Sequence, residues 1–261
     1  MNTRLLRILI GTCRNRKLIQ IFGFVQDFSL LVHAISFLPL FRLMPDLSPL
    51  LVSLRLAATT VLVLLVVAVP FAYGLALSKH RLKPIIESLV SLPIALPPTV
   101  LGFYFLYVFG RGNAVGAWLA NTLDIQFVFS FTGLVLGSVV YGLPFMVQPV
   151  KNGFESIPLE VLENAMLDGA TRSQVFLRVA VPIARRSLLT GSALAFVHSL
   201  GEFGVVMMIG GNIAGETRTA SIALYDAVQG LDYSTAHIYA ALLLGAALLS
   251  ALPAFRWWQQ E

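Results

Sequence analysis

The sequence predicts an all-α membrane protein, and three observations lead to this fold class. Hydrophobic residues make up 57% of the 261-residue chain and charged residues only 12%, whereas soluble domains carry about a quarter charged residues. Long segments are nearly free of charge, because only Asp124 interrupts the stretch from Arg111 to Lys151 and no Asp, Glu, Lys or Arg lies between Asp232 and Arg256. The apolar residues run continuously rather than alternating, which favours spanning helices over barrel strands.

Residues 1–46 are expected to form a separate N-terminal extension. A basic head precedes an apolar stretch, 18–42, that polar residues interrupt. A secretory signal peptide fits poorly, because the long apolar core and the small-residue cleavage site are missing. Three alternatives remain open: an extra transmembrane helix, an interfacial amphipathic segment, or a translated leader absent from the mature protein, in which case Met44 is the true start.

The remainder of the chain, 47–261, contains about five segments that are long and apolar enough to span a membrane as helices. They lie near 50–78, 84–109, 130–150, 187–210 and 237–256. Pro97 and Pro98 break the second of these helices. That break is a simple kink, a re-entrant bend or a kink that lines a pathway.

Basic residues predict the orientation of these helices. Lys79, Arg81 and Lys83 follow the first of them, and such a cluster marks the cytoplasmic side of a membrane. Alternation then places 151–186, which holds five Lys and Arg residues, in the cytoplasm together with the C-terminus. The net charge of +5 is therefore attributed to membrane topology and not to a nucleic-acid partner.

The segment 152–186 is too polar to span and too long for an idle connection, which usually indicates a function. Its residue pattern predicts two short helices. Ser156 is expected to cap the first helix, with Pro158 in the opening turn, where a missing N–H costs nothing. One face of this helix is expected to carry three apolar residues at helical spacing, Leu159, Leu162 and Met166.

Gly169 is expected to end the first helix, because glycine readily adopts a positive φ. Thr171 and Gln174 then form the pattern of a capping box for the second helix, and Pro182 lies where the chain returns to the membrane. A helix–glycine–helix segment at a membrane surface presents an apolar stripe that the groove of a partner could bury.

The residues that define this loop, in chain order, are Glu163, Asn164, Ala165, Met166, Gly169, Ala170, Phe176, Val179 and Pro182. Their pattern resembles the EAA loop of ABC-importer permeases. The resemblance implies that the loop contains a coupling helix, which seats on a separate ATPase subunit. Two positions depart from the pattern: Asn164 replaces the first alanine, and Arg186 stands where a second proline is common.

A second resemblance extends over most of 47–256. Leu92–Arg111, Ser199–Gly204, Gly210–Ile213, Thr217 and Thr219 are similar to the corresponding segments of molybdate permeases. This implies the fold of a type I ABC importer membrane domain, which forms a homodimer with the pathway on the two-fold axis. It also implies a place in the bacterial inner membrane and molybdate as the substrate, with tungstate, sulfate and thiosulfate as alternatives.

Glu202 is expected inside the fourth spanning helix, where a carboxylate costs on the order of 2.5–3.5 kcal/mol and needs a partner. It is interpreted either as part of a gate or subunit contact, or as a structural carboxylate bonded to backbone at the break made by Gly201 and Gly204. Direct coordination of molybdate by Glu202 is not expected, because two negative groups repel. The full set of pore or gate candidates is Pro97, Pro98, His198, Gly201, Glu202, Phe203 and Gly204.

The chain is expected to be no enzyme, because it has no glycine-rich phosphate loop of the Walker type. His198 and Glu202 do not form the His-Glu-x-x-His motif of a zinc peptidase, and no metal site or cofactor is expected on this chain. ATP and magnesium are assigned to the partner ATPase, and a soluble oxyanion-binding protein is expected at the outer face. A stand-alone secondary transporter would need ion-coupling carboxylates in several helices, and only Glu202 and Glu87 qualify.

Overall fold

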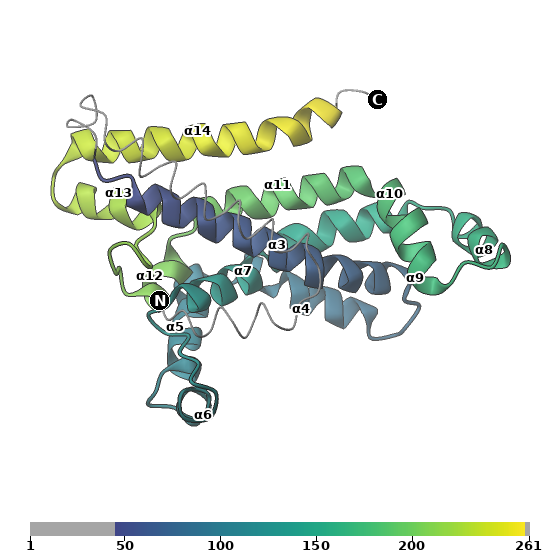
Figure 1. Ribbon diagram of the computed structural model, residues 1–261, viewed down its shortest axis with the longest axis horizontal. Coiled ribbons are helices and arrows are strands. Elements are labelled where there is room, and N and C mark those ends of the chain that lie inside the picture. Colours follow the sequence, from purple (N-terminus) through teal and green to yellow (C-terminus); the bar gives the residue numbers. More distant parts are fainter. Residues whose placement is uncertain (1–44, 259–261) are drawn as a thin grey trace, which may run out of the picture. The chain divides into compact units, whose positions relative to one another are not determined.

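The computed structural model describes residues 45–258, with side chains described as far as residue 251, and every regular element in this part of the chain is helical (Figure 1). The predictions for residues 1–44, including the extra helix and the Met44 start, fall outside the described residues.

Three helices are long and apolar enough to cross a membrane individually: α3 (Ser48–Leu77), α7 (Phe131–Glu155) and α14 (Tyr233–Trp258). Two bent pairs have the same character, so the number of spans rises to five if each pair is one span. This agrees with the five spanning segments expected from the sequence.

The first bent pair replaces the second predicted helix. Helices α4 (Lys83–Ala95) and α5 (Pro98–Phe109) meet at an angle of 104°. A residue that precedes proline is pushed out of the helical region by the proline ring. Leu96 and Pro97 both precede a proline and both are extended, with ψ values of 139° and 133°. The break predicted at Pro97–Pro98 is therefore confirmed, and it is a sharp turn rather than a slight kink.

The second bent pair comprises α11 (Arg185–Gly201) and α12 (Gly204–Gly210), which meet at 57°. Glu202 and Phe203 form the break between them. Glu202 is extended, with a ψ of 131°, and Phe203 is outside the helical region at φ −125°. The predicted fourth helix is therefore interrupted at the carboxylate that it was expected to carry.

Helices α3, α7 and α11 pack against one another and form the centre of the bundle. Leu64 and Ala68 of α3, Met146 and Val150 of α7, and Ala195 of α11 are each completely buried there. Alanine between larger aliphatic residues allows these helices to approach closely, as is typical of helix packing in membranes.

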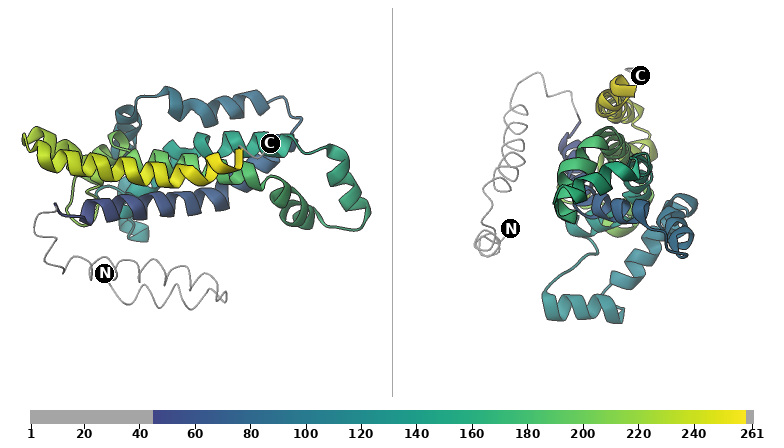
Figure 2. Two further views of the ribbon diagram at one scale, coloured as in Figure 1. Left: turned by 90° about the horizontal axis from the view of Figure 1, so that it is seen from above. Right: turned by 90° about the vertical axis from the view of Figure 1, so that its right-hand side faces the viewer.

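Shorter helices complete the described part of the chain. Helix α6 (Ala114–Leu123) lies between the second and third predicted spanning segments, and α13 (Ala220–Gln229) lies between the fourth and fifth. Four more elements form the polar loop: α8 (Leu159–Leu167), α9 (Arg172–Val175), the π-helical turn η2 (Phe176–Ala180) and α10 (Val181–Ile183). In Figure 1, α8 and α9 lie at one end of the bundle and α12 and α13 at the other. Figures 1 and 2 also show that α6 extends away from the bundle, to which it is joined through α5.

Asp232 stabilises the start of α14. Its Oδ1 accepts hydrogen bonds from the Ser234 hydroxyl at 2.6 Å and from the Thr235 backbone N–H at 3.1 Å. These hydrogen bonds lower the pKa of Asp232 to about 2. A negative group at a helix N-terminus is favourable.

Candidate functional site

The two helix breaks border a common open cleft of about 410 Å³. Its walls come from the start of α5, the middle of α7 and the break between α11 and α12. The lining residues are Pro98, Thr99, Tyr141, His198, Gly201, Glu202, Phe203 and Gly204. All the pore candidates named from the sequence lie here except Pro97, which precedes Pro98 but does not line the cleft. Thr99 and Tyr141 were not among the candidates.

Glycine allows the two breaks to lie this close together. A Cβ atom on Gly204 would lie 2.6 Å from Cβ of Pro98 and 3.3 Å from the backbone nitrogen of Thr99. One turn further along α5, a Cβ on Gly102 would lie 2.8 Å from Cβ of Met208. The contact between α5 and α12 thus depends on residues without side chains at both positions.

Glu202 is 5% exposed and is held by two other helices. Its Oε2 accepts a hydrogen bond of 2.7 Å from the hydroxyl of Ser138 on α7. Its backbone carbonyl accepts a bond of 2.6 Å from the hydroxyl of Ser221 on α13. The other carboxylate oxygen, Oε1, is buried and has no hydrogen-bond partner among the described residues. The side-chain partner of this carboxylate is therefore a serine hydroxyl and not the neighbouring backbone.

His198 lies one turn before Glu202 on α11 and packs against two aromatic rings. Its imidazole stacks on Phe145 with ring centroids 4.0 Å apart, and the ring of Tyr141 lies 4.7 Å away. Nε2 of His198 is buried without a hydrogen-bond partner in the part of the chain that the structure describes. The histidine is thus fixed by ring packing, while one polar atom of its imidazole remains unpaired.

The polar loop forms the helix–glycine–helix segment expected from the sequence. After α8, the N–H of Gly169 donates to the carbonyl of Met166 at 3.0 Å, and the N–H of Ala170 donates to that of Ala165 at 3.1 Å. This pair of bonds, with φ of +91° at Gly169, is a Schellman motif. The capping box of Thr171 and Gln174 at the start of α9 is also confirmed.

The expected role of Ser156 is wrong. Ser156 lies at the C-terminal end of α7, and its hydroxyl donates to the carbonyl of Gly153 instead of capping α8. Pro158 immediately precedes α8 and is extended, with a ψ of 133°. The physical reason is that α7 continues as far as Glu155, so that the serine belongs to the helix that ends there.

The apolar face expected on α8 is divided between the core and the surface. Leu162 is 3% exposed and packs in the same buried cluster as Val175. Leu159 and Met166 are about half exposed, and Leu167 is 84% exposed. Of the other residues predicted for the coupling loop, Ala165 and Ala170 are half-buried, whereas Glu163, Asn164, Gly169 and Pro182 are exposed.

Aromatic packing connects this loop to the spanning helices. The ring of Tyr73 on α3 lies 5.1 Å from that of Phe154 on α7 and 4.9 Å from that of Phe176, the first residue of the π-helical turn. Phe154 is fully buried. The loop is therefore in close contact with both α3 and α7.

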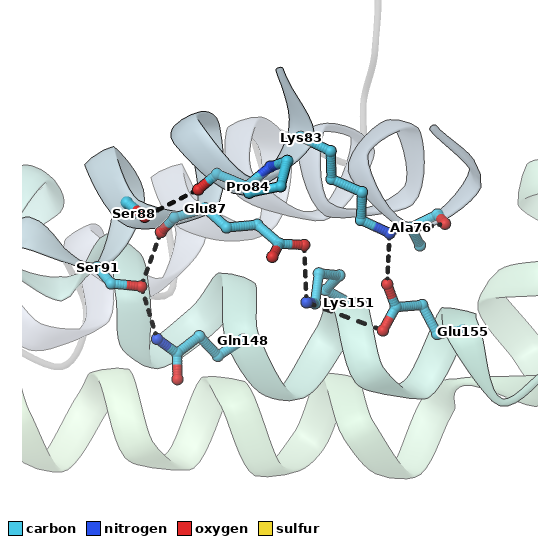
Figure 3. A network of polar contacts seen from close by, with 9 residues as sticks. All are labelled: Ala76, Lys83, Pro84, Glu87, Ser88, Ser91, Gln148, Lys151 and Glu155. Atoms are coloured by element: carbon cyan, nitrogen blue, oxygen red, sulfur yellow. Dashed lines mark hydrogen bonds and ion pairs between the residues drawn. The ribbon is translucent and has the colours of Figure 1, made fainter. Parts of the chain in front are cut away.

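An ionic network joins the start of α4 to the end of α7 (Figure 3). Lys83 Nζ lies 2.7 Å from Glu155 Oε1, and Lys151 Nζ lies 2.9 Å from Glu87 Oε1 and 3.8 Å from Glu155 Oε2. Glu87, which qualified as an ion-coupling carboxylate, is thus paired with a lysine. The network also places the basic segments after α3 and at the end of α7 at one end of the bundle.

Potential spanning helices that break at a shared cleft, with a helical loop at one end of the bundle, are the features expected of a membrane permease subunit. The chain belongs to the family of binding-protein-dependent transport system inner membrane components, whose family profile matches residues 68–259. It is therefore a membrane-spanning permease subunit of an ABC importer.

Individual relatives refine this assignment. The chain is 44% identical to the molybdenum transport system permease protein ModB of Azotobacter vinelandii over 211 residues, which are 80% of this chain and 92% of that protein. It is 35% identical to the sulfate transport system permease protein CysT of Escherichia coli, covering 66% of this chain and 63% of CysT. The crystal structure of a bacterial alginate ABC transporter, in complex with alginate pentasaccharide-bound periplasmic protein, shares the fold. That match has a TM-score of 0.67 and 19% identity, and covers 96% of this chain and 91% of the other.

Proposed function

We propose that this chain carries molybdate across the bacterial plasma membrane. The single observation that supports this substrate is the 44% identity to a molybdenum permease over 92% of that relative's length. Sulfate is the second candidate, because the chain is also 35% identical to a sulfate permease, although over only 63% of that protein. Tungstate resembles molybdate in charge and shape and belongs with it as an alternative.

The transport complex in this proposal contains three kinds of component. Two copies of the chain enclose the pathway, with the open cleft of each copy contributing one wall. An ATPase binds ATP and magnesium and docks on α8 and α9 in the cytoplasm, and a periplasmic or extracellular oxyanion-binding protein docks at the other end. The segment 151–186 that contains α8 and α9 holds five Lys and Arg residues, as the positive-inside rule expects of a cytoplasmic segment.

Uptake by reconstituted vesicles tests the substrate. The permease, its ATPase and its oxyanion-binding protein would be incorporated together, and ATP-dependent uptake of molybdate, tungstate and sulfate compared at equal occupancy of the receptor. We expect molybdate and tungstate uptake to exceed sulfate uptake. Faster sulfate uptake would overturn the substrate assignment while leaving the transporter class intact.

Docking on the loop is tested by Gly169→Pro. Proline cannot adopt the φ of +91° at this position and removes the N–H that donates to Met166. We expect the variant permease to fold in the membrane but to lose co-purification with the ATPase. Gly215→Pro is the matched control, because Gly215 also has a positive φ, +76°, but lies in the loop after α12 at the other end of the bundle.

The gate role of Glu202 has its own test. Glu202→Gln keeps the shape of the side chain and removes its charge. We expect altered uptake together with altered basal ATPase activity, because Glu202 is bonded to both α7 and α13. If uptake, basal ATPase activity and thermal stability all match the unmodified protein, the gate assignment is wrong.

A further inference from the structure

We propose that Thr99, Tyr141 and His198 form a transient binding station for a tetrahedral oxyanion inside the cleft. The two hydroxyl groups, and the imidazole in the tautomer with its proton on Nε2, donate hydrogen bonds to the oxygens of the anion. The proposal deepens the transport function stated above and rests on it, since it names the residues that the anion meets between receptor and cytoplasm.

The first argument is that these donors are unpaired. Among the described residues, no hydrogen bond is made by the hydroxyl of Thr99 or by that of Tyr141, and Nε2 of His198 is buried without a partner. Polar groups shielded from water are almost always paired in folded proteins, so an unpaired group calls for an explanation. Nε2 of His198 is such a group, and Thr99, which is exposed, and Tyr141, which is half-buried, line the same cleft, so all three donors are free to bind a ligand that supplies acceptors.

The second argument is that the three donors belong to three different helices. Thr99 lies in the first turn of α5, Tyr141 in the middle of α7 and His198 one turn before the break of α11. A tetrahedral anion presents oxygens in several directions, and donors on three separate helices can approach it from different sides. The aromatic packing of His198 between Phe145 and Tyr141 holds its imidazole in place for this task.

The third argument concerns the strength of binding. Glu202 is the only Asp, Glu, Lys or Arg residue that lines the cleft, so an anion there meets neutral donors and one carboxylate. A lysine or arginine would hold a divalent anion tightly, whereas a transport pathway requires binding that is weak enough for release. Ser138 binds one oxygen of Glu202, and the remaining negative charge opposes a long stay of the anion.

The test uses the complete complex in vesicles and removes one hydroxyl at a time. Tyr141→Phe and Thr99→Val preserve shape and delete only the donor. We expect each to lower the maximal rate of molybdate uptake about fivefold, the equivalent of one hydrogen bond of about 1 kcal/mol. The concentration of loaded receptor at half-maximal rate stays constant, and the number of anions imported per ATP hydrolysed falls.

Two matched controls remove the same groups elsewhere. Tyr225→Phe deletes a hydroxyl that pairs with Gln229 on α13, and Thr59→Val deletes one that donates to the carbonyl of Arg55 within α3. Neither residue lines the cleft. We expect unchanged uptake per ATP in both controls.

Several outcomes would overturn the proposal of a binding station in the cleft. Unchanged uptake in the double variant Tyr141→Phe, Thr99→Val would mean that water or packing alone accounts for the unpaired groups. An equal loss of uptake and ATPase activity would assign the residues to coupling. If size-exclusion chromatography shows that the Tyr141→Phe complex fails to assemble, the uptake of the Thr99→Val complex alone tests the proposal. If the unmodified complex imports sulfate but not molybdate, the substrate proposal fails, and the same variants test the station with sulfate.

Discussion

The cleft and the ionic network are both polar clusters between helices, but they differ in how completely their polar groups are paired. In the network, each of the four charged side chains of Lys83, Glu87, Lys151 and Glu155 has an ionic partner. In the cleft, Nε2 of His198 and Oε1 of Glu202 are buried without a hydrogen-bond partner in the described part of the chain. A fully paired cluster stabilises one arrangement of helices, whereas unpaired groups reduce stability and are retained where a ligand passes.

The two clusters share helix α7, and α4 of the network is joined directly to α5 of the cleft. Helix α4 carries Glu87 in the network and leads directly into the break before Thr99. Helix α7 carries Tyr141 in the cleft and Lys151 in the network, ten residues or about 15 Å further along its axis. The network therefore holds α4 against α7 at the loop end of the bundle.

The largest effect is expected from a side chain added at the contact between α5 and α12, beside the cleft. In Gly204→Val, the new side chain begins 2.6 Å from Cβ of Pro98, so α5 must move away from α12. We expect loss of uptake and a decrease in stability of about 1–3 kcal/mol, the usual cost of overpacking. Thermal unfolding of the purified permease and uptake by vesicles measure the two effects.

Gly74→Val is the control for that substitution. Gly74 lies on α3, and a Cβ atom added there would meet no atom within 4 Å beyond its chain neighbours and the backbone of its own helix. We therefore expect nearly normal stability and uptake. Comparable losses at both positions would show that helical glycine itself, and not the contact at the cleft, determines the effect.

A smaller effect is expected when Glu202 loses its one side-chain donor. Ser138→Ala leaves both oxygens of a buried carboxylate unpaired, which costs about 2 kcal/mol by analogy with other unsatisfied buried groups. Adding Glu202→Gln should recover part of this loss, because a neutral amide is less costly to bury than a carboxylate. Unfolding measurements on both single variants and the double variant give the coupling between the residues.

Ser192→Ala provides the comparison for Ser138→Ala. The hydroxyl of Ser192 donates to the carbonyl of Leu188 in its own helix, so its removal should change stability by only a few tenths of a kcal/mol. A loss as large as that of Ser138→Ala would contradict the special role of the bond to Glu202.

Local chemistry explains which features the sequence could predict. The break before α5 follows from two successive prolines, and the end of α8 follows from a glycine that can adopt a positive φ. The break at Glu202 was part of only one of the two interpretations of this residue, the one in which Gly201 and Gly204 interrupt the helix. Ser156 was assigned to the wrong helix because the end of α7 and the start of α8 are only four residues apart, and a serine can serve either end.

The remaining features depend on contacts between distant parts of the chain. Glu87 and Lys151 are separated by 64 residues, and Lys83 and Glu155 by 72, so no local pattern indicates these pairs. Thr99 and Tyr141 are ordinary residues of apolar helices in the sequence. Their significance follows only from the fold, which brings them to the same cleft and leaves their hydroxyls unpaired.

The smallest effect is expected from the ionic network, because its side chains retain between 17% and 35% of their exposure and water screens partly exposed pairs. Lys151→Met should lower the stability by about 1 kcal/mol, and Lys79→Met, at an exposed lysine of the same end, by less.

The double variant Glu87→Lys, Lys151→Glu exchanges the two charges of one ion pair. It should restore part of the lost stability, because the pair forms again with its charges reversed. The recovery is only partial because Glu155 then faces a like charge. Raising the salt concentration to about 1 M, where the screening length is about 3 Å, should reduce the difference between Lys151→Met and the unmodified protein. A difference that persists at high salt would mean that the aliphatic part of Lys151 stabilises the helix pair, and the network would then hold α4 by packing and not by charge.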